Sequence, residues 1–203
     1  MIARRVRGKV SQSELDDLIE RHEFWLSGRS HTICDRLLLT GVNLIGLVFD
    51  HHNLARAHIC DALLNRTSLR GTNLREANLS GTSFTGADFG NANLEQADME
   101  DCYLGFANLT GSNLHGATMR DASLSGARLD RAHFTHVDAR GVDLTGACLR
   151  GTFFCEPNQT ENTRPTLLIN ASLVGADLTN AHHLDTVDLS RSDLSGAIIE
   201  QSA

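Results

Sequence analysis

Residues 72–126 read TNLRE-ANLSG-TSFTG-ADFGN-ANLEQ-ADMED-CYLGF-ANLTG-SNLHG-ATMRD-ASLSG when they are divided into groups of five. The third residue of each group is large and apolar, and the first residue is small, most often alanine. An amphipathic helix needs apolar residues every three or four positions and a half-buried strand needs one at every second position, so a strict period of five fits neither. It fits a chain that makes the same bend after every five residues and directs each large residue, here termed the centre, at one axis.

The same period predicts which side chains point inward. The centre and the small residue two positions before it should face the core, and the other three residues of each group should face solvent. Those three are mostly Asn, Asp, Ser, Thr, Arg and Gly, and glycine recurs in the last place, where a corner of the backbone needs conformational freedom. Centres continue from Leu39 to Phe154 and resume at Leu168.

The A-(N/D)-L-x-x pattern, as in ANLSG at residues 77–81, resembles the repeats of the pentapeptide-repeat proteins over residues 32–201. The resemblance implies an all-β fold: a right-handed quadrilateral β-helix of about eight coils with four pentapeptides per coil. Residues that lie four pentapeptides apart should then stack at a strand spacing of roughly 4.8 Å. Two parts are expected: a basic arm and capping helix at residues 1–30, and the β-helix at residues 31–203.

The N-terminal part contains the one convincing helix, at residues 11–26. Ser11 and Glu14 form a capping box, and one helix face carries apolar residues. We expect this helix to cover the first coil, whose core and strand edges would otherwise be bare. The basic residues 1–10 are expected to form a solvated arm.

The repeat pattern breaks between Phe154 and Thr166. Residues 156–165 contain both prolines of the chain and no apolar residue, which predicts a loop projecting from one corner. The step from Leu178 to the next apolar centre, Leu184, is one position longer than the period, which predicts a one-residue bulge near residues 180–181. The candidate loop residues are Glu156, Pro157, Asn158, Glu161, Arg164 and Pro165.

Composition narrows the function classes. The formal net charge is −7, and the chain has no apolar run of membrane-spanning length and no signal-peptide core, so we expect a cytoplasmic protein without direct nucleic-acid or membrane binding. The family resemblance implies a bacterial protein. Five cysteines lack CxxC spacing and are expected to be reduced. No nucleophile elbow, P-loop or zinc signature occurs, and a uniform rod lacks a concave pocket, so no catalytic residue, metal or cofactor is expected.

Stacking of successive coils predicts an acidic side of the rod, opposed only by Arg120 and Arg140. A non-enzymatic scaffold for a protein partner, basic or DNA-binding, is the first hypothesis. The alternative comes from the family resemblance: some members protect type II topoisomerases such as DNA gyrase from inhibitors and imitate duplex DNA. Those members tend to end in a dimerising helix, which this sequence does not show. The predicted acidic side consists of Asp61, Asp98, Glu100, Asp101, Asp121 and Asp138.

The last repeats predict an apolar end to the rod. Only four residues follow Ile199, too few for a helix that would cover the final coil. A bare coil end presents unpaired backbone groups, and a symmetric contact between two such ends closes at two copies. A homodimer through the C-terminal coils is therefore expected, with Leu194, Ile198 and Ile199 in the contact.

Overall fold

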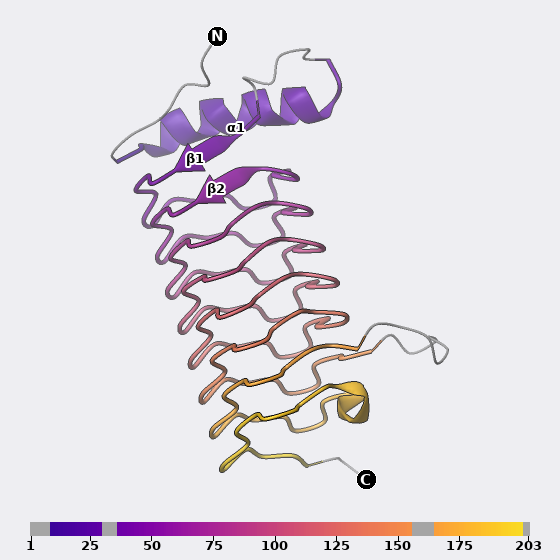
Figure 1. Ribbon diagram of the computed structural model, residues 1–203. Helices are drawn as coiled ribbons and strands as arrows, with labels where there is room; N and C mark the ends of the chain where they lie inside the picture. Colours follow the sequence, from indigo (N-terminus) through magenta and orange to yellow (C-terminus); the bar gives the residue numbers. More distant parts are fainter. Residues whose placement is uncertain (1–8, 30–35, 156–164, 201–203) are drawn as a thin grey trace.

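The computed structural model describes residues 9–29, 36–155 and 165–200. Its regular elements are helix α1 (Gln12–Leu26), strands β1 (Leu38–Thr40) and β2 (His58–Cys60), and a short 3-10 helix, η2 (Leu184–Thr186). The chain winds into a stack of similar coils, and α1 lies across one end of the stack (Figure 1). The fold is therefore a repeat solenoid, as the period of five predicts.

The coils are held in a parallel register in which each residue pairs with the one four pentapeptides later. Leu38 pairs with His58 where β1 meets β2, and further along the chain Asn73 pairs with Asn93 at the same spacing. Each side of a coil is extended for only a few residues between corners, so most pairings are single bridges.

Four pentapeptides thus make one coil, and the molecule has four sides. We name them by their centres: side A (Leu39, Ile59, Leu79, Met99, Met119, Ala139, Leu168, Leu189), side B (Leu44, Leu64, Phe84, Leu104, Leu124, Leu144, Leu173, Leu194), side C (Phe49, Leu69, Phe89, Leu109, Leu129, Leu149, Leu178, Ile199) and side D (Leu54, Leu74, Leu94, Leu114, Phe134, Phe154).

The core has the composition that the sequence predicts. Centres such as Leu94 and small residues such as Ala92 are almost completely buried. Where a small slot holds a polar residue, its hydroxyl can donate to a backbone carbonyl of the neighbouring coil, as from Thr72 to Phe49 at 2.8 Å, or of the same coil, as from Thr67 to Leu64 at 2.7 Å. This removes the cost of burying an unpaired hydroxyl in a narrow core.

Each corner is made by the residue two positions after a centre, which adopts a left-handed conformation. Gly81 has φ 65°, and Asp101, which is not glycine, has φ 57°. Glycine has a second role here, because it leaves room for a side chain of the preceding coil. A Cβ at Gly81 would lie 2.5 Å from Oδ1 of Asp61, and a Cβ at Gly126 would lie 2.7 Å from Cε1 of Phe106. Asp61 and Phe106 therefore lie flat over a glycine of the next coil.

Helix α1 begins as predicted and packs its apolar face on the rod. The side chain of Ser11 accepts a hydrogen bond from the backbone N–H of Glu14, and the Glu14 carboxylate accepts from the backbone N–H of Ser11. Leu15 and Ile19 are fully buried in the same core as the coil centres. The capping helix is therefore continuous with the solenoid core.

Polar side chains of α1 satisfy the backbone edge of the first coil. The side-chain amide of Gln12 donates to the carbonyl of Val48 at 2.8 Å and accepts from its N–H at 2.9 Å. Fully buried His22 accepts from the N–H of Leu37 at Nδ1, 3.0 Å away, so Nε2 carries the proton that is donated to the carbonyl of Ala55 at 3.0 Å. The sequence pattern missed His22, because a histidine on an apolar face has no period of its own.

Two irregularities interrupt the register after Phe154. Asp138 pairs with Leu167, whereas the register of the earlier coils would pair it with position 158, so nine residues are inserted between neighbouring coils. Residues 156–164, which include all but Pro165 of the predicted loop residues, lie outside the described part of the chain, and Pro165 is exposed beside buried Thr166. The insertion itself confirms that the repeat pattern is interrupted there.

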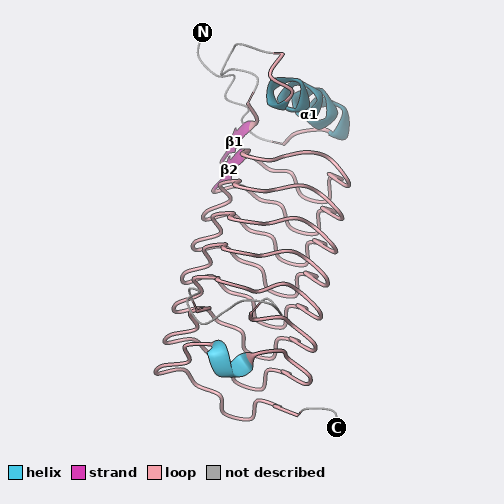
Figure 2. Cartoon of the chain, turned by 90° about the vertical axis from the view of Figure 1, so that its right-hand side faces the viewer, coloured by secondary structure: helices cyan, strands magenta, loops and turns pink. Residues whose placement is uncertain are grey.

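The predicted bulge at residues 180–181 is wrong in position. Asn180 keeps the left-handed corner conformation and Ala181 keeps a buried small slot. The extra residue lies in η2, which Figure 2 shows on the side of the rod facing the viewer, and the pairing shifts by one position only after it, where Leu167 pairs with Asp188. Leu184 packs against the core from this 3-10 turn, which absorbs one residue without breaking the corner before it.

Candidate protein-interaction surfaces

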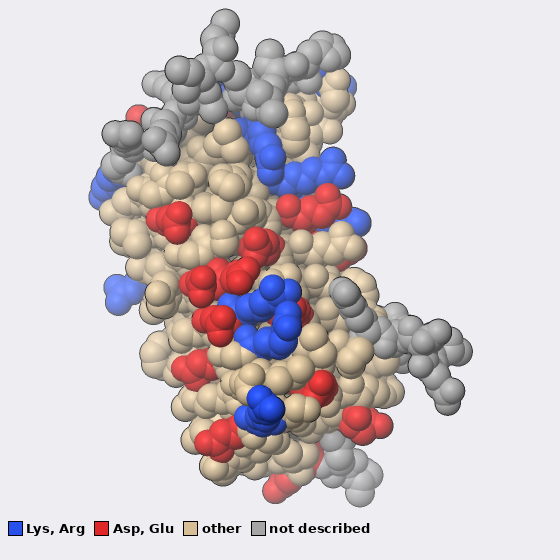
Figure 3. Space-filling model, in the orientation of Figure 1, with Lys and Arg blue, Asp and Glu red and all other residues tan. Residues whose placement is uncertain are grey.

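The predicted acidic residues gather on side A and on its corner with side B. Asp61, Asp101 and Asp121 occupy one corner column, which we term the acidic corner, and each adopts a left-handed conformation with φ between 52° and 57°. Asp98 and Glu100 lie beside this corner on side A itself and are half-buried. Figure 3, in which the face carrying β1 and β2 is toward the viewer, shows carboxylates gathered along this face.

Asp138, the sixth predicted acidic residue, is neutralised by its neighbours. Its carboxylate lies 2.7 Å from the guanidinium of Arg120 and 2.8 Å from that of Arg140. The hydrogen bond from Arg140 is the main cause that lowers the pKa of Asp138 to about 2, with Arg120 adding to it against the effect of burial. The other five carboxylates form no ion pair with any residue that the structure describes.

Side B is nearly free of charge and carries two exposed aromatic residues. Tyr103 is 58% exposed and Phe106 is 75% exposed. The described groups at 82–86, 102–106 and 122–126 contain no charged residue at all. Leu63 and Ile45, in the preceding coils of the same side, are also exposed. These residues extend the exposed apolar surface of Tyr103 and Phe106 along the side.

Side C, opposite side A, carries a basic patch. Arg128 and Arg150 lie 3.5 Å and 3.1 Å from the carboxylate of Asp130, which is 9% exposed, and Arg150 also approaches Asp177 at 3.8 Å. Arg131 forms no ion pair with a described residue, and together with Arg150 it lines two adjoining hollows of about 350 and 400 Å³. The patch therefore combines three arginines with two carboxylates, whereas the carboxylates of the acidic corner form no described ion pair.

Side D contains a stack of rings near this patch that the sequence pattern did not reveal. Phe153 stacks on His133 with ring centroids 5.1 Å apart and on His182 with centroids 4.5 Å apart. His133 and Phe153 occupy the place just before a centre, and His182 pairs with Phe153 across the insertion, so the register could have identified all three once the nine-residue insertion was known. No group of three metal-ligating side chains occurs among the described residues.

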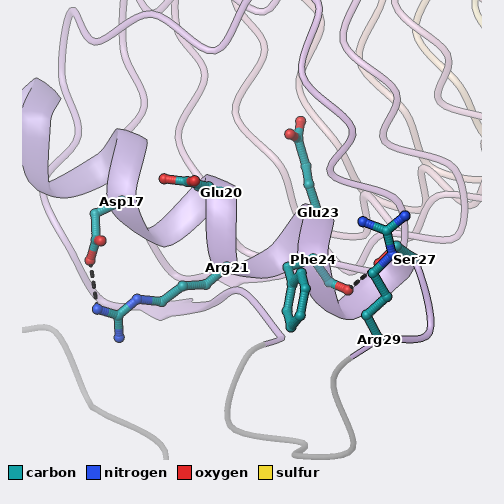
Figure 4. A pocket seen from close by; sticks show the side chains of 7 residues that line it. All are labelled: Asp17, Glu20, Arg21, Glu23, Phe24, Ser27 and Arg29. Atoms are coloured by element: carbon teal, nitrogen blue, oxygen red, sulfur yellow. Dashed lines mark hydrogen bonds and ion pairs between the residues drawn. The ribbon is translucent and has the colours of Figure 1, made fainter.

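The solvent side of α1 bounds an open hollow of about 690 Å³ (Figure 4). Asp17 and Arg21 face each other across one helix turn in an ion pair of 2.9 Å. Glu23 turns from the helix toward the first coil, where its carboxylate accepts a hydrogen bond from the N–H of Asn53 at 2.9 Å. Asp17 and Arg21 thus bind each other and Glu23 binds the coil, an arrangement typical of a solvated helix face. The lining residues are Asp17, Glu20, Arg21, Glu23, Phe24, Ser27 and Arg29.

The described cysteines are free thiols, as expected. Burial raises the pKa of the Cys102 thiol to about 12, and burial also raises the pKa of Cys60 and Cys148. Cys60 occupies an outward slot yet is only 6% exposed, because Asn78 and Ser80 of the next coil cover it. These thiols stay protonated near neutral pH. The described residues also include no helix that is long and apolar enough to cross a membrane.

The C-terminal coil is less covered than the others. Ile198 and Ile199 are 47% and 48% exposed, and Leu194 is half-buried. In earlier coils the N–H of each centre donates to the next coil, as from Leu173 to the carbonyl of Asp193 at 2.7 Å. The equivalent N–H groups of Leu194 and Ile199 have no acceptor among the described residues.

Comparison with known proteins agrees with this architecture. The family model described as pentapeptide repeats matches residues 53–91, 62–101, 87–126, 119–154 and 166–202, which together make up more than half of the chain. No match is found among curated proteins.

Several solved structures are similar, all at low identity. HetL, a pentapeptide repeat protein involved in heterocyst differentiation regulation from the cyanobacterium Nostoc sp. strain PCC 7120, is 24% identical over 89% of this chain and 95% of its own, with a TM-score of 0.38. A trypsin-treated variant of QnrB1, a plasmid-mediated fluoroquinolone resistance protein, is 18% identical over 81% of this chain and 90% of its own, with a TM-score of 0.48. Rfr23 from the cyanobacterium Cyanothece 51142 is 19% identical over 71% of this chain and 87% of its own, with a TM-score of 0.38. On the evidence of the family model and the regular register between coils, the chain belongs to the pentapeptide-repeat family.

Proposed function

We propose that this protein is a non-enzymatic scaffold whose acidic corner, with Asp98 and Glu100, binds a basic surface of a partner protein in the cytoplasm. The observation that carries the proposal is that these five carboxylates share one face without an ion pair to a described residue. Like charges in neighbouring coils repel, which is a cost that a purely structural surface has no reason to bear. A cationic partner would remove that repulsion.

We propose further that the solenoid is right-handed and has about eight coils. At a strand spacing of about 4.8 Å per coil, it forms a rod roughly 40 Å long. A rod of this length presents its corners as straight columns. Asp61 and Asp121 are three coils apart, and therefore span roughly 15 Å along the axis. Duplex DNA carries about one charge per 1.7 Å, or roughly nine charges over that length, against five carboxylates here.

A second candidate is a DNA mimic that binds and protects a type II topoisomerase such as DNA gyrase. The regular axial repeat of the acidic corner favours it, and the lower charge density, with Arg120 and Arg140 on the same side, favours the general protein scaffold. A supercoiling assay with DNA gyrase and a gyrase inhibitor, with and without this protein, distinguishes the two. Restored supercoiling that depends on the acidic corner would support the mimic.

The experiment for the scaffold is charge reversal. A variant carrying Asp98→Lys, Glu100→Lys and Asp101→Lys is compared with Arg131→Glu on the opposite side as a matched control for surface charge. Partners captured from the source cells by the wild-type protein should be lost with the triple variant and kept with the control. Their binding should weaken with salt for the wild-type protein and depend less on salt for the triple variant. Equal capture by all three proteins would overturn the proposal.

We also propose that two copies associate through their C-terminal coils. The exposed side chains of Ile198 and Ile199 and the N–H groups of Leu194 and Ile199 without a described acceptor support this contact. An isologous contact would cover both apolar ends at once and would close at two copies.

A further inference from the structure

We propose that side B is a docking face for an amphipathic α-helix of a partner protein, with Tyr103 and Phe106 as apolar anchors and basic residues of that helix along the acidic corner. The inference rests on the proposed scaffold function and names the structural class of its partner. It adds a contact surface that charge alone does not identify.

The backbone conformation and the exposure of Phe106 both cost free energy, and the fold of the single chain does not require either of them. Its φ of 57° is left-handed, a conformation that costs an L-residue roughly 1–2 kcal/mol. Every other described non-glycine residue with a positive φ has a polar or charged side chain, so Phe106 is the apolar exception among them. Three-quarters of its surface is also exposed to water. A partner that buries this ring would recover the apolar part of that cost.

The ring of Phe106 is nevertheless held in place. It lies over Gly126 of the next coil, where an added Cβ would approach Cε1 to 2.7 Å and Cδ1 to 2.8 Å. Because Gly105 has no side chain, the surface between Tyr103 and Phe106 is recessed. An aromatic side chain that is already oriented loses less entropy on binding, which is typical of interface anchors.

The backbone of side B selects a helix over a strand as the occupant. The N–H groups of its centres already donate to the next coil along the rod axis, as in the 2.7 Å bond from Leu104 to the carbonyl of Ser123. A strand adds to a sheet at an edge, where a row of backbone groups is free. Because the coils pair along the rod axis, as from Ser83 to Tyr103 and from Tyr103 to Ser123, side B presents no such edge in the middle of the rod. A helix instead contacts a surface through side chains on one of its faces.

The spacing of the acidic corner matches a helix that lies along the rod. Asp101 and Asp121 are one coil apart, and Asp61 and Asp101 are two coils apart, which corresponds to roughly 5 and 10 Å. Helix residues four and seven apart rise about 6 and 10.5 Å. Lysine or arginine at such positions would face all three carboxylates while the apolar face of the helix covers Tyr103 and Phe106. Tyr103 follows Asp101 by two residues, so the apolar and acidic surfaces adjoin.

The test uses the full chain and a fluorescent 18-residue peptide of leucine and lysine at amphipathic helical spacing. Binding is measured by fluorescence anisotropy. Phe106→Gly removes the anchor and should weaken binding at least tenfold while the melting temperature does not fall, because the left-handed strain is relieved. A peptide with glutamate in place of lysine should bind at least tenfold more weakly than the lysine peptide.

Two glycine variants separate the anchor from general destabilisation. Gly126→Ala should displace the Phe106 ring and weaken binding. Gly146→Ala, in the same corner column with nearly the same φ (64° against 65°) and nothing within 4 Å of its added Cβ, should bind like the wild-type protein. Unchanged peptide binding in both Phe106→Gly and Gly126→Ala would overturn the inference. Self-association of the wild-type protein that Phe106→Gly abolishes would overturn it in favour of a second copy. Either result leaves the acidic-corner proposal standing, because that proposal is judged by charge reversal alone.

Discussion

Replacing His22 with alanine should detach the cap from the solenoid. The variant loses two hydrogen bonds of 3.0 Å and leaves the buried N–H of Leu37 and the partly buried carbonyl of Ala55 without their partner. Each unsatisfied buried group costs about 1–3 kcal/mol. The void left by the ring, which also stacks on Trp25 at 5.5 Å, adds to this cost. We expect a loss of about 3–5 kcal/mol for the cap and first coil, in the range of large-to-small core substitutions.

Amide hydrogen exchange measures where that loss occurs. A solenoid is held together mainly by contacts between neighbouring coils, so exchange should accelerate at Leu37 and Val48 and stay nearly unchanged at Leu114. His52→Ala is the control: this side chain is 40% exposed and pairs with Glu23 at 3.2 Å, so its loss should cost only about 0–1 kcal/mol. Equal exchange at Leu37 in wild-type protein and His22→Ala would refute the assignment of His22 as the residue that holds the cap.

Acidification should reproduce part of the same effect. Burial lowers the pKa of His22, against the opposing effect of its hydrogen bond to Ala55. The unfolded chain, with a histidine pKa of about 6.5, therefore binds a proton more readily than the folded cap does. The contribution of His22 to stability is complete above that pH and is lost progressively as the pH falls below it. The protection factor of the Leu37 amide, which is the intrinsic exchange rate divided by the observed rate, should fall between about pH 7 and pH 5 in the wild-type protein, and His22→Phe should lack this fall.

Four other outcomes test the remaining structural statements. Leu94→Asp buries an unpaired carboxylate and should lower the free energy of unfolding by several kcal/mol, seen as a lower thermal midpoint; an unchanged midpoint would contradict the register. Deleting residues 156–164 restores the regular spacing between coils and should leave the circular dichroism spectrum unchanged, whereas an unfolded product would show that the insertion supports the core. Light scattering at micromolar concentration should find a dimer that Ile199→Asp dissociates, and a wild-type monomer would contradict the C-terminal contact. Asp138 should titrate at about pH 2 by NMR, so that its ion pairs stabilise the fold above its ordinary pKa near 3.8 and are lost as the pH falls toward 2; titration near 3.8 would show that they do not form in solution.

The period of five determined most of the fold by itself. A residue such as Leu94 is inward because every fifth position must face the same axis, and this rule depends only on local bends repeated along the chain. The capping box of Ser11 and Glu14 is likewise local, as is the interruption after Phe154. Such features need no knowledge of distant contacts.

The acidic corner was predictable from the sequence for a related reason. Once residues four pentapeptides apart are known to stack, Asp101 and Asp121 must be neighbours. Their surroundings were less predictable: the register places Asp138 near two arginines, but only the side-chain conformations show that both guanidinium groups close on it.

Only the tertiary structure decided the features that depend on contact between different parts of the chain. In the sequence, His22 is one polar residue of a helix. Its role in holding the cap follows from its hydrogen bonds to Leu37 and Ala55 of the first coil. The extra residue after Leu178 could be absorbed at several corners, and packing of Leu184 on the core selects η2. Phe106 is an ordinary corner residue in the sequence, and it becomes a positioned anchor because Gly126 of the next coil leaves room for its ring. In each case the deciding energy comes from side-chain packing between neighbouring coils or between the cap and the first coil, which a repeat period does not encode.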